Sequence, residues 1–453
     1  MSATGQSLPL SLWRDLRFRR FWAGQSISQF GDRITELALP LIAVGALHAS
    51  ANEVAWLTAL VWVPNLLAMV LGAWVDQRVH KRRLMVLADL ARAAVLLSLP
   101  VTYLVGAVSL GQLYVVALLT GAAGVLFNTA YPPFFVRLVP RSSYIDANSK
   151  LSTSRSASYV VGPAVGGALI QALTAPAAVA VDVLTFLASA VLIGRVSIDE
   201  PPVAAGQAAR SVLQRARESL GFVVRHPVLR ASLGCAATAN FFTFVGGSGL
   251  IVLFAGRNLG LTAGVIGAAF GIGATGSILG AVIAPVISRR LGVGRTIAVG
   301  AVLFPAPLAI AAAAGGQLWT RAGALALSEF LAGIGVMLFD VNLNSLQSNV
   351  VPDGMRSRVA GAYSTINYGL RPVGAVVGGL LATLIGLRST LLIAAVGGAL
   401  SVLWLLPSPI PRIHSLTPDL PQAALDRDRD GDSDTDGDMD GHTGGDAGAN
   451  ALL

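Results

Sequence analysis

The sequence predicts an all-α integral membrane protein with about twelve transmembrane helices in two parallel six-helix halves. Three observations predict this fold class. Of the 453 residues, 54% are hydrophobic and only 12% are charged, whereas a soluble globular domain is about 25% charged. The chain divides into apolar segments long enough to cross a bilayer. Landmarks in its first half also recur in its second half at one constant spacing.

The apolar segments are the predicted spans, because a transmembrane helix needs about 20 mostly apolar residues. They lie near 21–47, 54–75, 84–106, 112–135, 151–173, 176–194, 231–255, 263–287, 296–315, 322–344, 359–385 and 389–407. Every second connection between spans is rich in Arg and Lys. In the other connections the only basic residues are Arg257, Arg321 and Arg388. By the positive-inside rule, both termini are expected in the cytoplasm of a multi-pass protein of the cell inner (plasma) membrane.

An internal repeat predicts how the spans are arranged. Shifting the sequence by 212 residues aligns Leu47 with Leu259, Arg78 and Arg83 with Arg290 and Arg295, Val139-Pro140 with Val351-Pro352, and Gly166-Gly167 with Gly378-Gly379. The two halves have the same orientation because each contains an even number of spans. Parallel repeats of this kind place a substrate site near the bilayer midplane, between the halves.

Five regions follow from this division: a cytoplasmic arm (1–20), an N-terminal half (21–195), a cytoplasmic linker (196–228), a C-terminal half (229–407) and an acidic tail (408–453). Within the linker, SVLQRARESLGFVVRH is predicted to be an amphipathic interfacial helix. The tail is expected to be disordered, since it is acidic and poor in apolar residues. Its Asp-rich run has Thr443 where a calcium loop beginning at Asp432 requires a bidentate Glu.

Several functional classes are not supported. The single Cys235 excludes an internal disulfide, and the five histidines have no ligand spacing, so no metal site or cofactor is expected. No P-loop or nucleophile elbow appears, which argues against an ATP-driven pump or an enzyme. The sequence pI of about 10.2 reflects basic loops between spans, so nucleic acid is not an expected partner.

The loop between spans two and three carries a gating signature. Gly72-Ala73-Trp74-Val75-Asp76, Arg78 and the run His80 to Arg83 resemble the G-x-x-x-D-R-x-G-R-R signature of the major facilitator superfamily. Gln77 and Val79 depart from that pattern. The resemblance implies a cytoplasmic gate formed by Gly72, Asp76, Arg82 and Arg83. The alternative is that the basic residues serve topology alone.

Span five carries a second signature, Gly162-Pro163-Ala164-Val165-Gly166-Gly167. It is similar to the G-P-x-x-G-G core of that superfamily's antiporter motif, represented here by Gly162, Pro163, Gly166 and Gly167. Two further short motifs are Phe30-Gly31-Asp32 (FGD) in span one and residues 88–93 (ADLARA) in span three. With these motifs, residues 12–407 resemble the bacterial macrolide-efflux and siderophore-exporter branch of the superfamily, which consists of drug:proton antiporters. The resemblance implies export coupled to antiport. Close packing of small residues is the alternative for the glycines.

Three charges interrupt span one. Asp32 lies eleven residues past Phe21, about 16 Å along a helix and thus near the middle of a hydrocarbon core of about 30 Å. Glu36 follows at i+4 on the same face. Burial and mutual repulsion both disfavour the ionised forms, so Asp32 and Glu36 are proton-coupling candidates. In the alternative, Arg33 and Glu36 form a structural pair and Asp32 bonds to the backbone or to neighbouring amides.

Other polar residues in the spans are candidates to line a substrate cavity. Arg371 lies near the midplane of span eleven, where it would counter a carboxylate or bind an anionic substrate. Asn65, Asn240 and Tyr368 complete the predicted cavity set, although interhelical bonding or packing also explains them. Further embedded carboxylates are Asp182, Glu329 and Asp340. Asp340 is expected nearer the cytoplasmic end, in gating.

The function predicted from these features is secondary active export of an amphipathic small molecule, such as a drug, a macrolide-like metabolite or a siderophore. Proton antiport would drive the export by alternating access. The alternatives are an uptake permease of the same fold and a non-transporting membrane sensor. The expected partners are the substrate, protons and the lipid bilayer, with the chain acting as a monomer.

Overall fold

The computed structural model describes residues 12–68, 71, 74–75, 78–140, 143–198, 220–351 and 356–415. Side chains at 145, 248, 356–358, 360–362 and 364 are not described. The acidic tail from residue 416 and most of the linker (199–219), which includes residues 211–219 of the predicted interfacial helix, therefore lie outside the described residues. All regular elements within the described residues are helical, and up to His414 they belong to one compact unit.

The helices before the linker, here called the N-terminal helices, match the first six predicted spans. A short 3-10 helix, η1 (Leu12–Arg14), precedes them. They are α1 (Leu16–Gly45), α2 (Ala51–Trp62) continued by the 3-10 helix η2 (Val63–Leu67), α4 (Lys81–Leu104), α5 (Leu110–Leu138), α6 (Tyr144–Ala172) and α7 (Ala175–Gly194).

The helices after the linker, here called the C-terminal helices, match the other six spans. They are α9 (Pro227–Gly246) with α10 (Ser248–Arg257), α11 (Ala263–Leu291), α12 (Val293–Leu303) with α13 (Leu308–Ala313), α14 (Leu318–Val350), α15 (Arg356–Ile385), and α16 (Leu387–Ala399) with η6 (Leu400–Trp404). The 3-10 helix η7 (Ile410–Arg412) follows.

Within the described part of the chain, nine helices are long and apolar enough to cross a membrane. The three predicted spans outside that set correspond to α1, α2 with η2, and α6. In α1 the embedded charges interrupt an otherwise apolar helix, and α2 has only 12 residues before η2 begins. A total of twelve spans is therefore consistent with the structure, and the all-helical membrane fold is confirmed.

Local chemistry explains where several helices begin and break. Ser50 and Glu53 form a reciprocal capping box at the start of α2, which satisfies backbone donors that a helix end leaves free. Asp15 caps α1 by accepting the Arg17 backbone N–H at 2.8 Å. Burial opposes ionisation of Asp15, but hydrogen bonds to Arg17 and its positive charge outweigh this and lower the Asp15 pKa. Gly247 separates α9 from α10 at φ +40°, a conformation that favours glycine.

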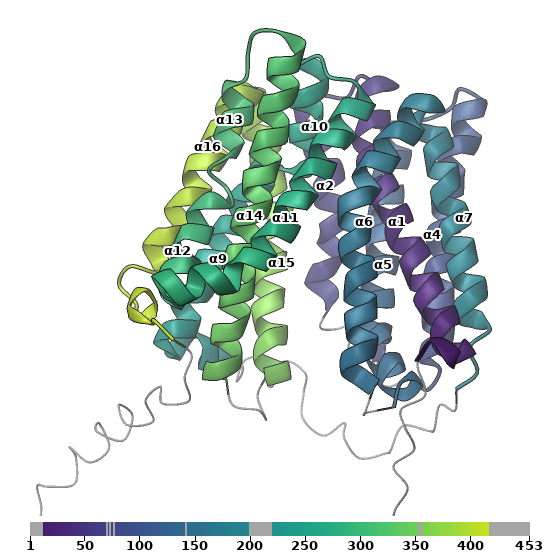
Figure 1. Cartoon of the computed structure of the whole chain (residues 1–453). Coiled ribbons are helices and arrows are strands. Elements are labelled where there is room, and N and C mark those ends of the chain that lie inside the picture. The colour runs from purple at the N-terminus through teal and green to yellow at the C-terminus, as the bar shows by residue number, and fades with distance from the viewer. Residues whose placement is uncertain are drawn as a thin grey trace, which may run out of the picture. The chain divides into compact units, whose positions relative to one another are not determined.

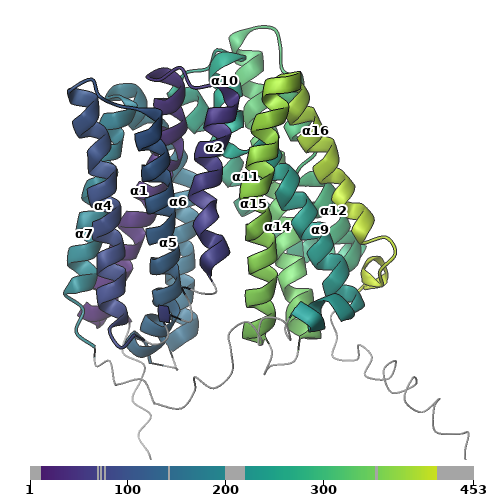
Figure 2. The same cartoon turned by 180° about the vertical axis from the view of Figure 1, so that it is seen from behind.

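The helices pack in two groups that meet along α2, α6, α10, α11 and α15 (Figures 1 and 2). In the first group α7 packs against α1 and α4, with α5 and α6 beside them. In the second, α14 packs against α11 and α12, and α9 packs against α15 and α16. Between the groups, α6 contacts α11, α15 contacts α2, and α10 contacts α1 and α2.

Glycines bring the two groups into backbone contact. A Cβ added at Gly167 of α6 would lie 2.9 Å from Gly267 Cα in α11. A Cβ added at Gly379 of α15 would collide with Ala55 of α2. Because Gly379 is Gly167 shifted by 212 residues and Gly267 is Ala55 shifted by the same amount, the two contacts are counterparts in the repeat. We call the α6–α11 and α2–α15 contacts the seam.

Candidate functional site

Arg33 and Glu36 form an ion pair on α1. Arg33 Nη1 donates to Glu36 Oε2 at 2.5 Å, and the Arg33 guanidinium lies 4.3 Å from the centre of the Tyr159 ring on α6. Gly162 makes room for it, since a Cβ there would lie 2.5 Å from Arg33 Cγ. The structure thus contains the Arg33–Glu36 pair that the sequence offered as the structural alternative, and the contact of Arg33 with Tyr159 joins α1 to α6.

Asp32 takes its cationic partner from another helix. Arg92 Nη1 on α4 lies 3.9 Å from Asp32 Oδ1, and the Arg92 guanidinium also lies near the rings of Phe186 and Phe127. The Asp32 side chain is 38% exposed, whereas that of Arg92 is 11% exposed. The two carboxylates predicted as a pair on α1 therefore have separate cationic partners, and Asp32 remains accessible.

Asp182 of α7 is fully buried against α1. The Thr35 hydroxyl donates to Asp182 Oδ2, and the Thr185 hydroxyl lies 2.7 Å from Asp182 Oδ1. A Cβ at Gly31 would overlap both Asp182 and Thr185. The glycine of the FGD sequence therefore allows α7 to bring this carboxyl against α1, one residue before Asp32.

Asp89 of α4 is also fully buried. Its Oδ2 accepts the Ser189 hydroxyl at 2.6 Å, while its Oδ1 has no hydrogen-bond partner among the described residues. Asp32 and Arg92 interact electrostatically with both buried carboxyls. We call Asp32, Asp89, Asp182 and Arg92 the carboxyl cluster. It gathers three acidic groups and one basic group from α1, α4 and α7.

Arg371 lies among aromatic rings that come from both groups of helices. Its guanidinium carbon is 4.2 Å from the ring centre of Trp62 on α2, 4.3 Å from that of Tyr368, and 5.0 Å from that of Phe244 on α9. Its Nε donates to Asn240 Oδ1 at 3.1 Å. The structure therefore brings three predicted cavity residues together, namely Arg371, Asn240 and Tyr368. We call these five residues the aromatic cage.

The other embedded polar residues predicted from the sequence belong neither to the carboxyl cluster nor to the five residues of the aromatic cage. Asn65 donates to the Trp62 carbonyl at 3.3 Å, so its side chain satisfies the backbone where α2 ends. Glu329 packs against Gly273, where a Cβ would lie 2.7 Å from Glu329 Cβ. Asp340 interacts electrostatically with Arg371, which associates it with the cage, and its expected role in gating stays a prediction.

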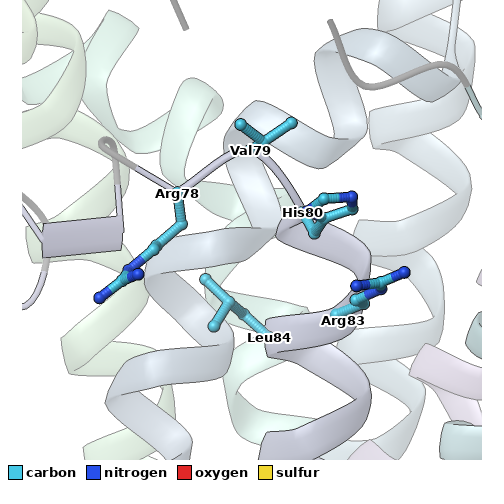
Figure 3. A pocket seen from close by; sticks show the side chains of 5 residues that line it. All are labelled: Arg78, Val79, His80, Arg83 and Leu84. Carbon is cyan, nitrogen blue, oxygen red and sulfur yellow. The ribbon is translucent and has the colours of Figure 1, made fainter. Parts of the chain in front are cut away.

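The predicted cytoplasmic gate is described only in part. Gly72 and Asp76 lie outside the described residues. Arg82 Nη1 donates to the Val196 carbonyl at 2.6 Å, which binds the start of α4 to the chain that follows α7. Arg83 lines a cavity of about 360 Å³ at the start of α4 (Figure 3), together with Arg78, Val79, His80 and Leu84.

The sequence analysis assigned no role to Arg92, and it mentioned Asp89 only within the ADLARA resemblance. The sequence did contain a signal for Asp89 and Arg92. An Asp and an Arg three residues apart in an apolar span have a high free-energy cost of burial in the membrane unless they are paired. The hydroxyls of Thr35, Thr185 and Ser189 gave no comparable signal. Their role depends on which helices become neighbours.

The comparisons with known proteins fit this geometry. A family model for the Major Facilitator Superfamily matches residues 21–372. The chain belongs to the major facilitator superfamily. It is therefore a multi-pass membrane transporter and not an enzyme, and the family resemblance drawn from the loop and span-five motifs is confirmed.

Two relatives of this major facilitator chain are similar over most of their length. The multidrug efflux pump Tap of Mycolicibacterium fortuitum is 28% identical over 390 residues, covering 80% of this chain and 88% of that protein. An uncharacterized MFS-type transporter, YfiS of Bacillus subtilis (strain 168), is 26% identical over 381 residues, covering 82% and 88%. These relatives are consistent with the drug-efflux branch of the superfamily.

Solved structures support the major facilitator fold. A bacterial homologue of the iron transporter ferroportin, in an inward-facing state, has a TM-score of 0.67 at 16% identity, covering 88% of this chain and 100% of that one. A POT family transporter in complex with 5-aminolevulinic acid has a TM-score of 0.70 at 11% identity, covering 88% and 96%. At these identities the likeness concerns the fold alone.

Proposed function

We propose that the protein is a secondary active exporter that moves an amphipathic small molecule out of the cell in exchange for protons. The observation that carries the proposal is Asp32, an accessible carboxylate at mid-depth in α1 that lies 3.9 Å from the Arg92 guanidinium. Ionisable groups at such depth are costly and mark ion or substrate pathways. The relative Tap, a multidrug efflux pump, supports the outward direction of transport.

Asp32 is the proposed site of proton exchange with the cavity. When ionised, it is stabilised by the positive charge of Arg92, and when protonated it leaves that charge uncompensated. A proton on Asp32 therefore changes the electrostatic balance between α1 and α4. Glu36, which forms an ion pair with Arg33, is a second candidate.

Alternating access requires contacts that form on one side of the membrane and open on the other. With both termini in the cytoplasm, as the loop charges predict, the seam would lie on the outer side, and the described state would be the one open to the cytoplasm. Gly162, Pro163, Gly166 and Gly167 would allow α6 to approach α1 and α11 closely. Gly72, Asp76, Arg82 and Arg83 would close the cytoplasmic side in the opposite state.

The aromatic cage is the proposed substrate site, with Asn65 at its edge. Its rings offer apolar surface, and Arg371 and Asn240 offer polar partners. A site with mostly apolar walls and a few convergent polar groups suits an amphipathic molecule, such as a drug, a macrolide-like metabolite or a siderophore.

Transport in proteoliposomes tests this function. The purified protein would be given a pH gradient and a fluorescent amphipathic dye, and wild type would be compared with Asp32→Asn. Asp146→Asn is the matched control, because Asp146 is an exposed carboxylate paired with Lys150 at i,i+4 in the first turn of α6. We expect gradient-driven dye movement in wild type and in the control, and its loss in Asp32→Asn with dye binding retained. Equal gradient-driven movement in all three would refute the coupling role of Asp32.

A further inference from the structure

The carboxyl cluster contains more negative charge than its surroundings can compensate. If all its members were ionised, three carboxylates would face one guanidinium. Asp89 and Asp182 are fully buried, and a buried carboxylate without a full cationic partner is strongly disfavoured relative to its neutral form. Arg92 is shared, and its nearest oxygen in the cluster belongs to Asp32.

The other charged groups that act on the two buried carboxyls come from α1 and α4. From α1 the charged group is Asp32, and from α4 it is Arg92. The described residues of α5 and α6 contribute no charge that acts on Asp89 or Asp182. No set of acidic, His or Cys side chains within the described residues is grouped to hold a metal ion. A proton on each buried carboxyl would remove the excess charge without any further ligand.

Hydrogen-bond counting at Asp182 supports a bound proton. The Thr185 hydroxyl has one hydrogen but two acceptors within reach, the Asp182 backbone carbonyl at 2.8 Å and Asp182 Oδ1 at 2.7 Å. If Asp182 is ionised, the two acceptors share the one Thr185 hydrogen in a three-centre bond. A proton on Asp182 Oδ1 instead gives each contact a hydrogen of its own.

At Asp89 the evidence is an oxygen without a partner. Ser189 supplies one hydrogen bond to Oδ2, and Oδ1 is buried with none from the described residues. An ionised carboxylate normally accepts several hydrogen bonds when buried. A carboxyl that receives only one is expected in its neutral form.

We infer that Asp89 and Asp182 are two proton-binding sites within the N-terminal helices, and that Asp32 is the cluster member through which they exchange with the cavity. This inference deepens the proposed function and rests on it for the role of the protons in transport. Proton occupancy itself does not depend on that function. Asp32 and Arg92 link the two sites, so a change of charge on Asp32 alters the proton affinity of both.

The test is difference infrared spectroscopy of the full-length protein in nanodiscs, at the C=O stretch of protonated carboxylic acids. Spectra at neutral pH would be recorded for wild type, Asp89→Asn, Asp182→Asn and the control Asp146→Asn. We expect each of the first two variants to lose part of the carboxylic acid band, and the control to keep it. An unchanged band in both buried-site variants would overturn the inference.

A second variant guards against poor folding of the amide substitutions. Ser189→Ala keeps both carboxyls but removes the hydrogen bond to Asp89, so part of the band should shift in frequency without losing area. The absence of any shift would contradict a neutral Asp89. Dye transport by the wild type is scored separately. An unchanged band in both buried-site variants, with gradient-driven transport by the wild type, refutes only this inference. Loss of part of the band in those variants, without gradient-driven transport by the wild type, refutes only the proposed coupling.

Discussion

Arg371 shows how a single residue can hold a charge within the membrane, since it forms no ion pair with a carboxylate among the described residues. Three aromatic rings and the Asn240 amide oxygen surround its guanidinium. Cation–π contacts contribute about 0.5–2 kcal/mol each, more when they are desolvated. The shape of the side chain therefore matters as much as its charge, because only a planar guanidinium stacks well on several rings.

We expect Arg371→Lys to weaken dye binding several-fold and to lower the melting temperature, because lysine keeps the charge but loses the stacking and the fixed Nε donor. Arg388→Lys is the control. Among the described residues, Arg388 donates one hydrogen bond, to the Ala314 carbonyl at 3.0 Å, a bond that lysine can replace. Fluorescence polarisation and thermal unfolding of both variants check the prediction. Equal losses in the two would show that the cage has no special requirement for arginine.

A second residue-scale prediction concerns Glu36. Its pair with Arg33 is half exposed on the Glu36 side, and such helix pairs contribute about 0.2–0.5 kcal/mol. We expect Glu36→Gln to keep most of the gradient-driven transport, in contrast to Asp32→Asn. Parallel proteoliposome assays at one protein-to-lipid ratio measure this. Loss of coupling in Glu36→Gln alone would transfer the exchange role from Asp32 to Glu36.

At the scale of the element, α6 is defined by what its glycines touch. Gly162 admits the Arg33 side chain, Gly166 lies against Ile34 of α1, and Gly167 lies against α11. Within six residues, one helix therefore approaches both a neighbour in its own group and a helix across the seam. The G-P-x-x-G-G pattern predicted close packing, and the structure adds which neighbour each glycine serves.

Gly167→Ala should impair closure of the seam. The added methyl group would lie 2.7 Å from the Ala263 carbonyl oxygen and 2.9 Å from Gly267 Cα, and backbone atoms cannot move aside as side-chain ends can. We expect a large loss of transport with the protein still folded. Gly323→Ala in α14 is the control, since a Cβ there meets nothing within 4 Å. Transport rate and size-exclusion profile are the measurements, and equal activity of the two variants would contradict the prediction.

Much of the architecture could be predicted, because apolar length and loop charge are properties of contiguous sequence. All twelve predicted spans coincide with helices, and the 212-residue spacing reappears in the Gly167–Gly267 and Gly379–Ala55 contacts. The carboxyl cluster could not be predicted in the same way. Asp89, Asp182 and Asp32 come from three helices distant in sequence, and helical periodicity does not specify which neighbours those helices choose.

At the scale of the whole molecule, the seam joins helices that are far apart in the chain. Besides the glycine contacts, Gln171 at the end of α6 accepts the Gly264 backbone N–H at 2.9 Å. These contacts must separate if the molecule opens to the outside. A covalent bond across them would hold the structure in the described state.

We therefore expect a Gln171→Cys, Gly264→Cys pair to block transport when joined by a short thiol cross-linker, and a reductant to restore it. The experiment uses a Cys235→Ala background, since Cys235 is the chain's single cysteine. Each single-cysteine variant serves as a control. Unimpaired transport by fully cross-linked protein would mean that the seam does not open during the cycle.

The composition of the seam decides whether salt or the bilayer should shift the balance between its closed and open states. Among the described residues, its contacts are glycine backbone, small apolar side chains and the uncharged polar side chains of Asn52, Gln171 and Thr262, with no ion pair. Salt screens interactions between charges and has little to act on here. The balance between closed and open seam should therefore be nearly independent of external ionic strength. It should instead follow the lateral pressure and thickness of the bilayer, which act on how closely helices pack.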